Sequence, residues 1–221
     1  MANVTTVNGV RVIEGNTASL LGKVLWITTA GFLFTALGAY FAPPTLGVGY
    51  MLVVLVNFGF IFAISAAARR SSGLALVLFY AFTALMGVQI SPILNQYTHT
   101  LGGRAIVSEA AITTALGMAL MAIIAQFANF NYMKVGRIAM FALLGLIVIG
   151  FLGMFVHIIH PGVYAWLSLV IFSVLLLVDF MRLRDRGQAY GPVQMALSIY
   201  LDALNIFIAL LQIFGGGRRR D

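Results

Sequence analysis

The feature of this 221-residue sequence that most limits its fold is a series of seven long apolar stretches with almost no charged side chains. A helix needs roughly 20 apolar residues to cross the hydrocarbon core of a bilayer. With 62% hydrophobic and 9% charged residues, the chain is also too apolar for an ordinary soluble domain. We therefore predict an all-α membrane protein with seven transmembrane helices, at residues 24–42, 48–68, 73–93, 106–128, 138–157, 162–181 and 193–214.

The segments between these stretches are short, which predicts a single seven-helix membrane domain over residues 23–214. Residues 1–22 are mostly polar and lack the apolar region of a cleavable signal peptide, so we expect a mobile N-terminal tail. Residues 215–221, with three glycines and three arginines, form a basic C-terminal tail. The chain has no cysteine, which excludes disulfides, thiolate metal sites and a cysteine nucleophile.

The net charge of +7 comes from 13 basic and 6 acidic residues. The basic residues are spread over loops and the tail, so membrane loops explain them better than a nucleic-acid surface does. With the N-terminus in the cytoplasm, nine of them fall on the cytoplasmic side: Arg11, Lys23, Arg69, Arg70, Lys134, Arg137, Arg182, Arg184 and Arg186. We therefore expect a cytoplasmic N-terminus. The basic C-terminal tail opposes this orientation, and a re-entrant last segment would reconcile the two.

Glu109 lies at the start of the fourth apolar stretch, and two further carboxylates lie deeper inside their stretches, Asp179 toward the end of the sixth and Asp202 in the middle of the seventh. A charge at the centre of the bilayer costs about 2.5–3.5 kcal/mol on insertion scales, which makes both aspartates candidates for a functional site. Helical spacing places four other polar residues on the same helix face as Asp202: Gln194, Ser198, Asn205 and Gln212. This face is expected to point into the bundle, either bonding to other helices or lining a hydrated pathway.

A short polar loop joins the sixth and seventh stretches, so we expect two antiparallel neighbouring helices whose carboxyl groups meet near the inner leaflet. Two carboxylates in contact at a poorly hydrated site do not ionise together readily. Asp179 and Asp202 are therefore expected to share a proton and to act as a pH sensor. An alternative for Asp179 is an ion pair with Arg182 or Arg186.

Three segments resemble the Bax inhibitor-1 family, also called the transmembrane Bax inhibitor motif family. Residues 87–94, with Tyr97, are similar to the Gly- and Pro-containing end of its third helix. Asp179, after a long apolar helix, resembles its first aspartate. Residues 198–207, SIYLDALNIF, resemble its last-helix signature and are the most specific of the three. The similarity extends from about Lys23 to Phe214, and the short outer loops are most similar to those of bacterial members.

The resemblance implies that the last helix lies at the centre of a six-helix ring and that the protein is a pH-sensitive calcium leak channel, in a bacterial cell inner membrane. Asp179 and Asp202 would be the gate and the metal site, calcium the transported ion, and no cofactor is expected. In well-studied bacterial members of the family, a basic residue at the end of the second helix acts as a latch, holding the two aspartates together in the closed state. Here Ala67 occupies the position where the family has this basic residue, and Arg69 and Arg70 are the nearest candidates for the latch.

Seven helices and intramembrane aspartates also occur in other classes of membrane protein. A retinal protein needs a lysine in its last helix, but both lysines, Lys23 and Lys134, are expected in loops and neither is in the last apolar stretch. An intramembrane aspartyl protease is the weaker alternative, because Asp202 follows Tyr200-Leu201 rather than Gly-x-Gly. A regulatory protein acting through partners, such as a membrane protease or a stress-response factor, stays open. We expect no enzymatic activity, and as partners membrane lipids and calcium ions but no nucleic acid.

The distribution of basic residues makes a topological prediction. Single cysteines introduced beside Arg69, Lys134 and Arg184 should be labelled from the cytoplasmic side, and one beside Arg104 from the opposite side, because basic loops are retained in the cytoplasm. The absence of native cysteines leaves no background labelling. Cytoplasmic labelling beside Arg104 would contradict this orientation, and cytoplasmic labelling of the C-terminal tail alone would indicate a re-entrant last segment.

Overall fold

The computed structural model of the chain describes residues 4–7, 10–13, 17–43, 49–98, 102–153, 160–186 and 189–217. These residues contain seven helices that are long and apolar enough to cross a membrane, as predicted. In chain order the helices are α1 (Thr17–Tyr40), α2 (Gly49–Ala67), α3 (Ser72–Thr98), α4 (Gly103–Phe127), α5 (Tyr132–Gly153), α6 (Pro161–Arg186) and α7 (Pro192–Gly217).

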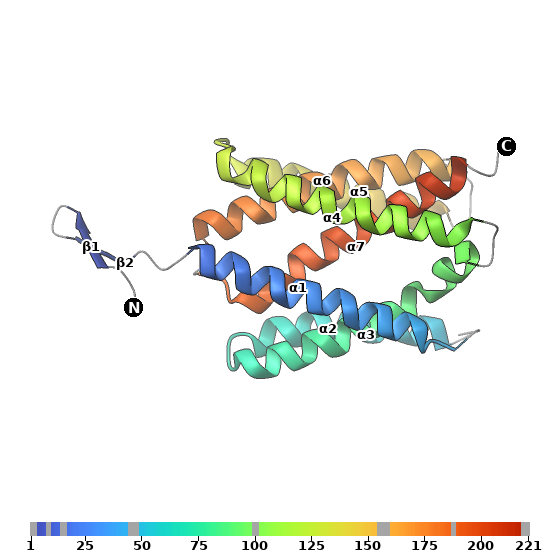
Figure 1. The fold of residues 1–221 in the computed structure, drawn as a ribbon, viewed down its shortest axis with the longest axis horizontal. Coiled ribbons are helices and arrows are strands. Elements are labelled where there is room, and N and C mark those ends of the chain that lie inside the picture. The colour runs from blue at the N-terminus through green and yellow to red at the C-terminus, as the bar shows by residue number, and fades with distance from the viewer. Residues whose placement is uncertain are drawn as a thin grey trace.

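A short antiparallel hairpin precedes the helices. Strand β1 (Val4–Val7) pairs with β2 (Val10–Ile13), with Val4 opposite Ile13, and the hairpin lies outside the helical bundle (Figure 1). α1 begins at Thr17, so the first helix starts within the segment expected to be a tail. The mobility of that segment stays a prediction, and residues 218–221 of the expected C-terminal tail lie outside the described residues.

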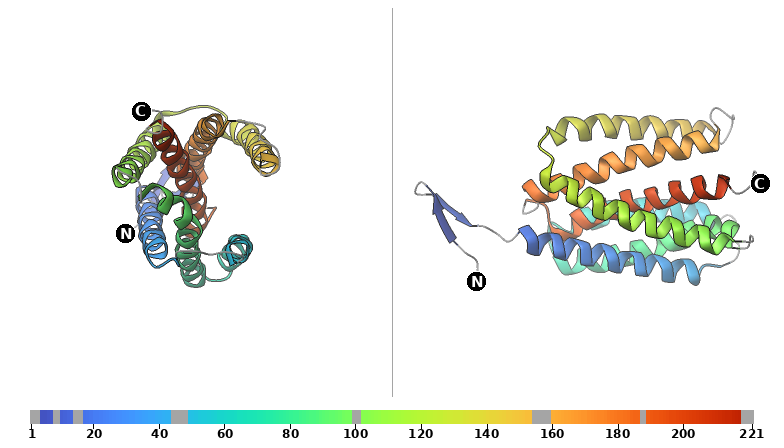
Figure 2. Two further views of the ribbon diagram at one scale, coloured as in Figure 1. Left: turned by 90° about the vertical axis from the view of Figure 1, so that its right-hand side faces the viewer. Right: turned by 45° about the horizontal axis from the view of Figure 1, so that its top comes forward.

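The last helix runs through the middle of the bundle, as predicted (Figures 1 and 2). On one side of it α3 packs against α1 and α2, and on the other side α6 packs against α4 and α5. α7 itself packs against α1, α3, α4 and α6. Within the described helices, no close packing joins α2 to α5 or α1 to α4. The ring around α7 is therefore loosest at these two places.

Glycines allow α1 and α3 to approach closely, as expected for membrane helices without large side chains at their crossing. A Cβ atom added to Gly38 of α1 would overlap the carbonyl oxygen of Ala84. A Cβ atom added to Gly87 of α3 would overlap the carbonyl oxygen of Thr35. The two backbones are thus in direct contact, and neither glycine can be replaced without moving a helix.

α3 contains Pro92 and continues five residues beyond residue 93, the predicted end of the third span, to Thr98. Proline has no amide hydrogen, so the carbonyl of Val88 loses its usual helical partner. The hydroxyl of Ser91 donates a hydrogen bond to this carbonyl over 2.9 Å. Membrane helices tolerate proline where a nearby side chain satisfies the freed backbone group in this way.

Tyr200 of α7 is completely buried at the centre of the bundle. Its ring lies against those of Phe32, Phe79 and Phe82, with centroid distances of 5.0, 5.7 and 6.1 Å. Its hydroxyl group is 2.6 Å from Oγ1 of Thr35, so the one polar atom of this aromatic cluster is hydrogen-bonded. The cluster attaches α7 to α1 and α3 and sets the rotation of α7 about its axis.

Replacing Gly87 with alanine should lower the thermal unfolding midpoint of the protein in detergent. The new methyl group would meet the α1 backbone, which cannot turn aside as a flexible side chain can, and overpacking of this kind costs about 1–3 kcal/mol. Gly117→Ala in α4 is the control, because its added Cβ meets nothing within 4 Å. Equal midpoints for Gly87→Ala and the wild type would show that the α1–α3 crossing is not as close as described.

Candidate functional site

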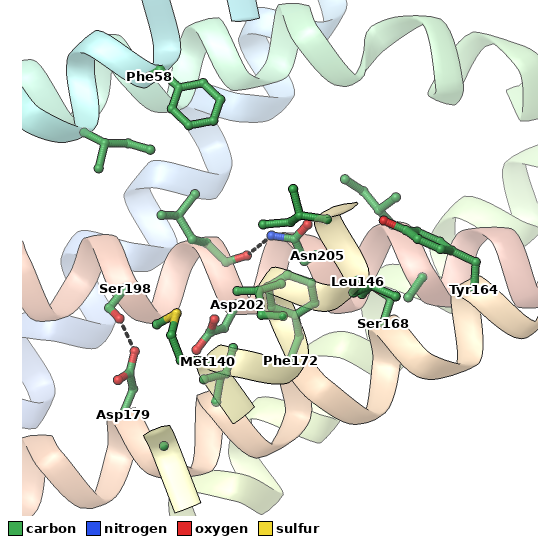
Figure 3. A pocket seen from close by; sticks show the side chains of 18 of the residues that line it. Phe58, Met140, Leu146, Tyr164, Ser168, Phe172, Asp179, Ser198, Asp202 and Asn205 are labelled. Carbon is green, nitrogen blue, oxygen red and sulfur yellow. Dashed lines mark hydrogen bonds between the residues drawn. The ribbon is translucent and has the colours of Figure 1, made fainter. Parts of the chain in front are cut away.

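A cavity of about 610 Å³ lies between α2, α5, α6 and α7, where the ring of helices is open (Figure 3). The α7 wall carries four of the five polar residues that helical spacing placed on one face: Ser198, Asp202, Asn205 and Gln212. The fifth, Gln194, is half-buried near the start of α7 and is not among the residues that line the cavity. Asp179 and Arg182 line it from α6. The structure therefore brings both predicted carboxylates to one cavity.

Asp179 is 4% exposed and is fully engaged in hydrogen bonding at one end of the cavity. Its Oδ1 accepts a hydrogen bond from Nη1 of Arg182, one turn later on the same helix, over 2.7 Å. Its Oδ2 accepts a hydrogen bond from the hydroxyl of Ser198 on α7 (Figure 3). Hydrogen bonds to an ionised carboxylate are among the stronger ones in proteins, so Asp179 links α6 to α7.

Asp202 lines the same cavity but lacks comparable partners. It is 7% exposed, and its buried Oδ2 has no hydrogen bond within the described part of the chain. The expected hydrogen bond between the carboxyl groups of Asp179 and Asp202 is not formed in this structure, because Arg182 and Ser198 bond to the Asp179 oxygens instead. A buried polar group without a partner is costly. Asp202 is thus the group in the cavity with the most to gain from binding a proton or a cation.

The polar wall runs far along the membrane axis. From Ser198 to Gln212 it covers about 21 Å of α7 at 1.5 Å per residue, which is most of the ~30 Å hydrocarbon thickness. Asn205 lies near its middle, where its Nδ2 donates to the Leu201 carbonyl over 2.8 Å (Figure 3). The opposite wall, from α2 and α5, is apolar: Phe58, Ile61, Met140, Leu143, Leu146 and Ile147. One side of the cavity is therefore suited to ions, and the other is not.

The two arginines predicted as a latch are not brought to the carboxylates. Arg69 and Arg70 are exposed at the end of α2, and the described residues show no ion pair between either of them and Asp179 or Asp202. Arg182 supplies the positive charge at this site instead. This ion pair was the alternative expected for Asp179, and the three-residue spacing explains it because both side chains lie on one helix face.

Arg184 has a different role from Arg182, although it is only two residues away. Its Nη1 donates to the carbonyl oxygens of Ala125 and Ala128, the latter over 2.9 Å, at the end of α4. The last carbonyl groups of a helix have no partner within it, so Arg184 caps α4 and binds α6 to it. Of these two arginines, only Arg182 lines the cavity.

Asn57 and Gln89 form a contact that the sequence analysis did not identify. Asn57 is 4% exposed in α2, and its Nδ2 donates to Oε1 of Gln89 in α3 over 2.6 Å. A single amide in an otherwise apolar membrane helix is expected to bond to a neighbouring helix, and this was the signal available. The bond holds α2 against α3 and so fixes the α2 wall of the cavity.

Comparison with known proteins supports the same family that the last helix suggested. A family model described as "Inhibitor of apoptosis-promoting Bax1" matches residues 17–220, which include all seven helices. A protein of Helicobacter pylori strain J99 is 28% identical over 198 residues, covering 89% of this chain and 83% of its own.

Two further relatives come from other bacteria. An "uncharacterized membrane protein" of Streptococcus pyogenes serotype M1 is 31% identical over 177 residues, covering 75% of this chain and 74% of its own. A protein of Borreliella burgdorferi is 29% identical over 225 residues, covering 91% of this chain and 93% of its own. With seven apolar helices and a family match over nearly its whole length, the chain is a multi-pass integral membrane protein that belongs to the Bax inhibitor family.

Proposed function

We propose that this protein is a pH-sensitive calcium leak channel of a bacterial inner membrane, with its N-terminus in the cytoplasm and with Asp179 and Asp202 as its gate. The observation that carries the proposal is the cavity, in which two buried carboxylates adjoin a polar wall that follows α7 across most of the bilayer thickness. Ionisable groups at this depth are expensive and mark ion or proton pathways in membrane proteins.

The charges of the cavity explain how pH would control the gate. In the closed state, Arg182 and Ser198 hold Asp179, and a proton on Asp202 leaves no net repulsion between the two acids. Raising the pH removes this proton and leaves two carboxylates against one guanidinium. The excess negative charge then favours either a cation in the cavity or a separation of α6 from α7. Protons and cations therefore compete for Asp202.

The ligands in the cavity suit a hard cation that binds weakly. Calcium prefers several oxygen ligands, and the oxygen-bearing side chains that line the cavity include those of Asp179, Asp202, Ser198 and Asn205. The described residues contain no cluster of three or more His, Asp or Glu side chains that would hold a metal permanently. Weak binding is what conduction requires, because an ion has to leave the site as well as enter it.

Calcium flux into liposomes that contain the pure protein should rise as the pH is raised. Asp202→Asn keeps the shape of the side chain but removes its titratable charge, so it should flatten the pH profile and weaken competition by protons. Asp179→Asn should also flatten it. Asp185→Asn is the matched control, because Asp185 is exposed, pairs with Arg184 and lies outside the cavity.

Three results would contradict this proposal, the first two as a whole and the third only for calcium. Unaltered pH profiles for both Asp179→Asn and Asp202→Asn would reject the aspartate gate. Absence of flux from the wild type, in liposomes where the protein is folded, would reject the channel and favour a regulatory role through protein partners. Equal flux of calcium and sodium would retain the gate but reject calcium selectivity.

Replacing Arg182 with glutamine should increase calcium flux at acidic pH. The change removes a positive charge that repels cations from the cavity, and it removes the ion pair that holds Asp179. For a partly exposed pair worth about 1 kcal/mol, the expected increase is on the order of fivefold. Arg69→Gln and Arg70→Gln should leave flux unchanged. An increase for Arg69→Gln with none for Arg182→Gln would assign the latch to α2 instead.

A further inference from the structure

A second cavity lies on the other side of α7, where α1 and α4 are not closely packed. Its volume is about 450 Å³. α1 and α4 form its two walls, and Leu204 and Phe207 of α7 form its floor together with Leu94 of α3. Residues two and five positions after Asp202 point to the opposite side of a helix from Asp202. α7 therefore separates a cavity with acidic residues from this second one.

The second cavity offers almost nothing to water or to an ion. None of the described residues that line it carries a charge or a side-chain amide. Three of its four threonines use their hydroxyl groups within the protein: Thr28 bonds to the Val24 carbonyl over 2.9 Å, Thr114 to the Ala110 carbonyl over 2.7 Å, and Thr35 to the hydroxyl of Tyr200 over 2.6 Å. A water molecule inside a protein needs two to four polar partners, and this cavity does not provide them.

The cavity is continuous with the surface that faces lipid. Its rim is formed by the small exposed side chains of Ala36, Ala111 and Ala115. Beside this rim, Leu33 of α1 is 64% exposed and Leu116 of α4 is 66% exposed, as lipid-facing residues are. Because α1 and α4 both belong to the membrane-spanning bundle, the cavity is a groove that opens sideways into the hydrocarbon of the bilayer.

We propose that this groove binds one hydrocarbon chain of a membrane lipid, which lies against Leu204 and Phe207 of α7. An empty groove would leave its walls without van der Waals partners, and a hydrocarbon chain supplies them without a polar ligand. Along α1 the groove extends from Leu25 to Ala39, about 21 Å at 1.5 Å per residue. The groove is longer than half of a ~30 Å hydrocarbon core, which is the depth of one leaflet. The tail of a lipid from one leaflet can therefore reach the α7 floor.

Quenching of tryptophan fluorescence by lipids with brominated tails tests this proposal. The two native tryptophans, Trp26 and Trp166, are both exposed and are first replaced by phenylalanine. Phe207→Trp then places a single indole at the floor of the groove, and Leu94→Trp is a second reporter if the first variant folds poorly. In liposomes of brominated phosphatidylcholine, the indole at position 207 should be quenched nearly as strongly as one at the lipid-facing position of Leu116.

A plugged groove provides the matched comparison. Ala111→Leu combined with Ala115→Leu fills the space between α1 and α4, so it should largely remove the quenching at position 207. Ala142→Leu adds a leucine side chain at an exposed position of α5, outside the groove, and should leave the quenching at position 207 unchanged. Equal quenching in the plugged and open proteins would overturn the proposal.

Other occupants of the groove predict different results. Quenching at position 207 by aqueous acrylamide, with none by brominated tails, would show a water-filled groove and overturn the proposal. Absence of brominated-tail quenching, together with a disulfide between two copies that carry Ala115→Cys, would assign the groove to a second copy of the chain and would also overturn it. Neither outcome depends on whether the protein conducts ions.

Discussion

The structure depends on one requirement, that a carboxyl group in the middle of a membrane helix must be kept away from lipid. Asp202 lies near the centre of α7, and α7 is the most buried of the seven helices. The other six helices surround it in two groups, and the aromatic cluster around Tyr200 attaches it to one of them. Because Tyr200 and Asp202 are two residues apart, fixing the tyrosine on the α1–α3 side directs the aspartate toward α5 and α6.

This arrangement gives α7 two different faces, and each matches one opening in the ring. The face with Asp202 and Asn205 borders the cavity between α2 and α5, and the face with Leu204 and Phe207 borders the groove between α1 and α4. Close packing on all sides would leave no room for an ion or a lipid tail. The loose contacts of the outer helices are therefore as important for the proposed functions as the tight α1–α3 crossing is for stability.

The number of helices and the polar face around Asp202 were predictable from hydrophobicity and helical spacing, because both act locally. The central position of α7 was implied only by the family resemblance of the last helix. Helix ends were less predictable, since hydrophobicity marks the membrane core whereas hydrogen bonds decide where a helix stops. α3, for example, continues five residues past the predicted end at residue 93, to Thr98. The ion pair of Asp179 with Arg182 was one of the alternatives that the sequence offered, because the two residues are three positions apart on one helix. The distance of Arg69 and Arg70 from the carboxylates was not predictable, because it depends on how α2 and α6 are placed in three dimensions.

The two carboxylates are not equivalent in the structure. Asp179 accepts hydrogen bonds at both oxygens and joins α6 to α7, so removing its charge disturbs a structural link. Asp202 has a buried oxygen without a partner, so a proton or a cation bound there satisfies a group that the protein leaves unsatisfied. We infer that Asp202 is the group that exchanges protons for cations, and that Asp179, through Ser198, transmits the change in charge to the contact between the two helices.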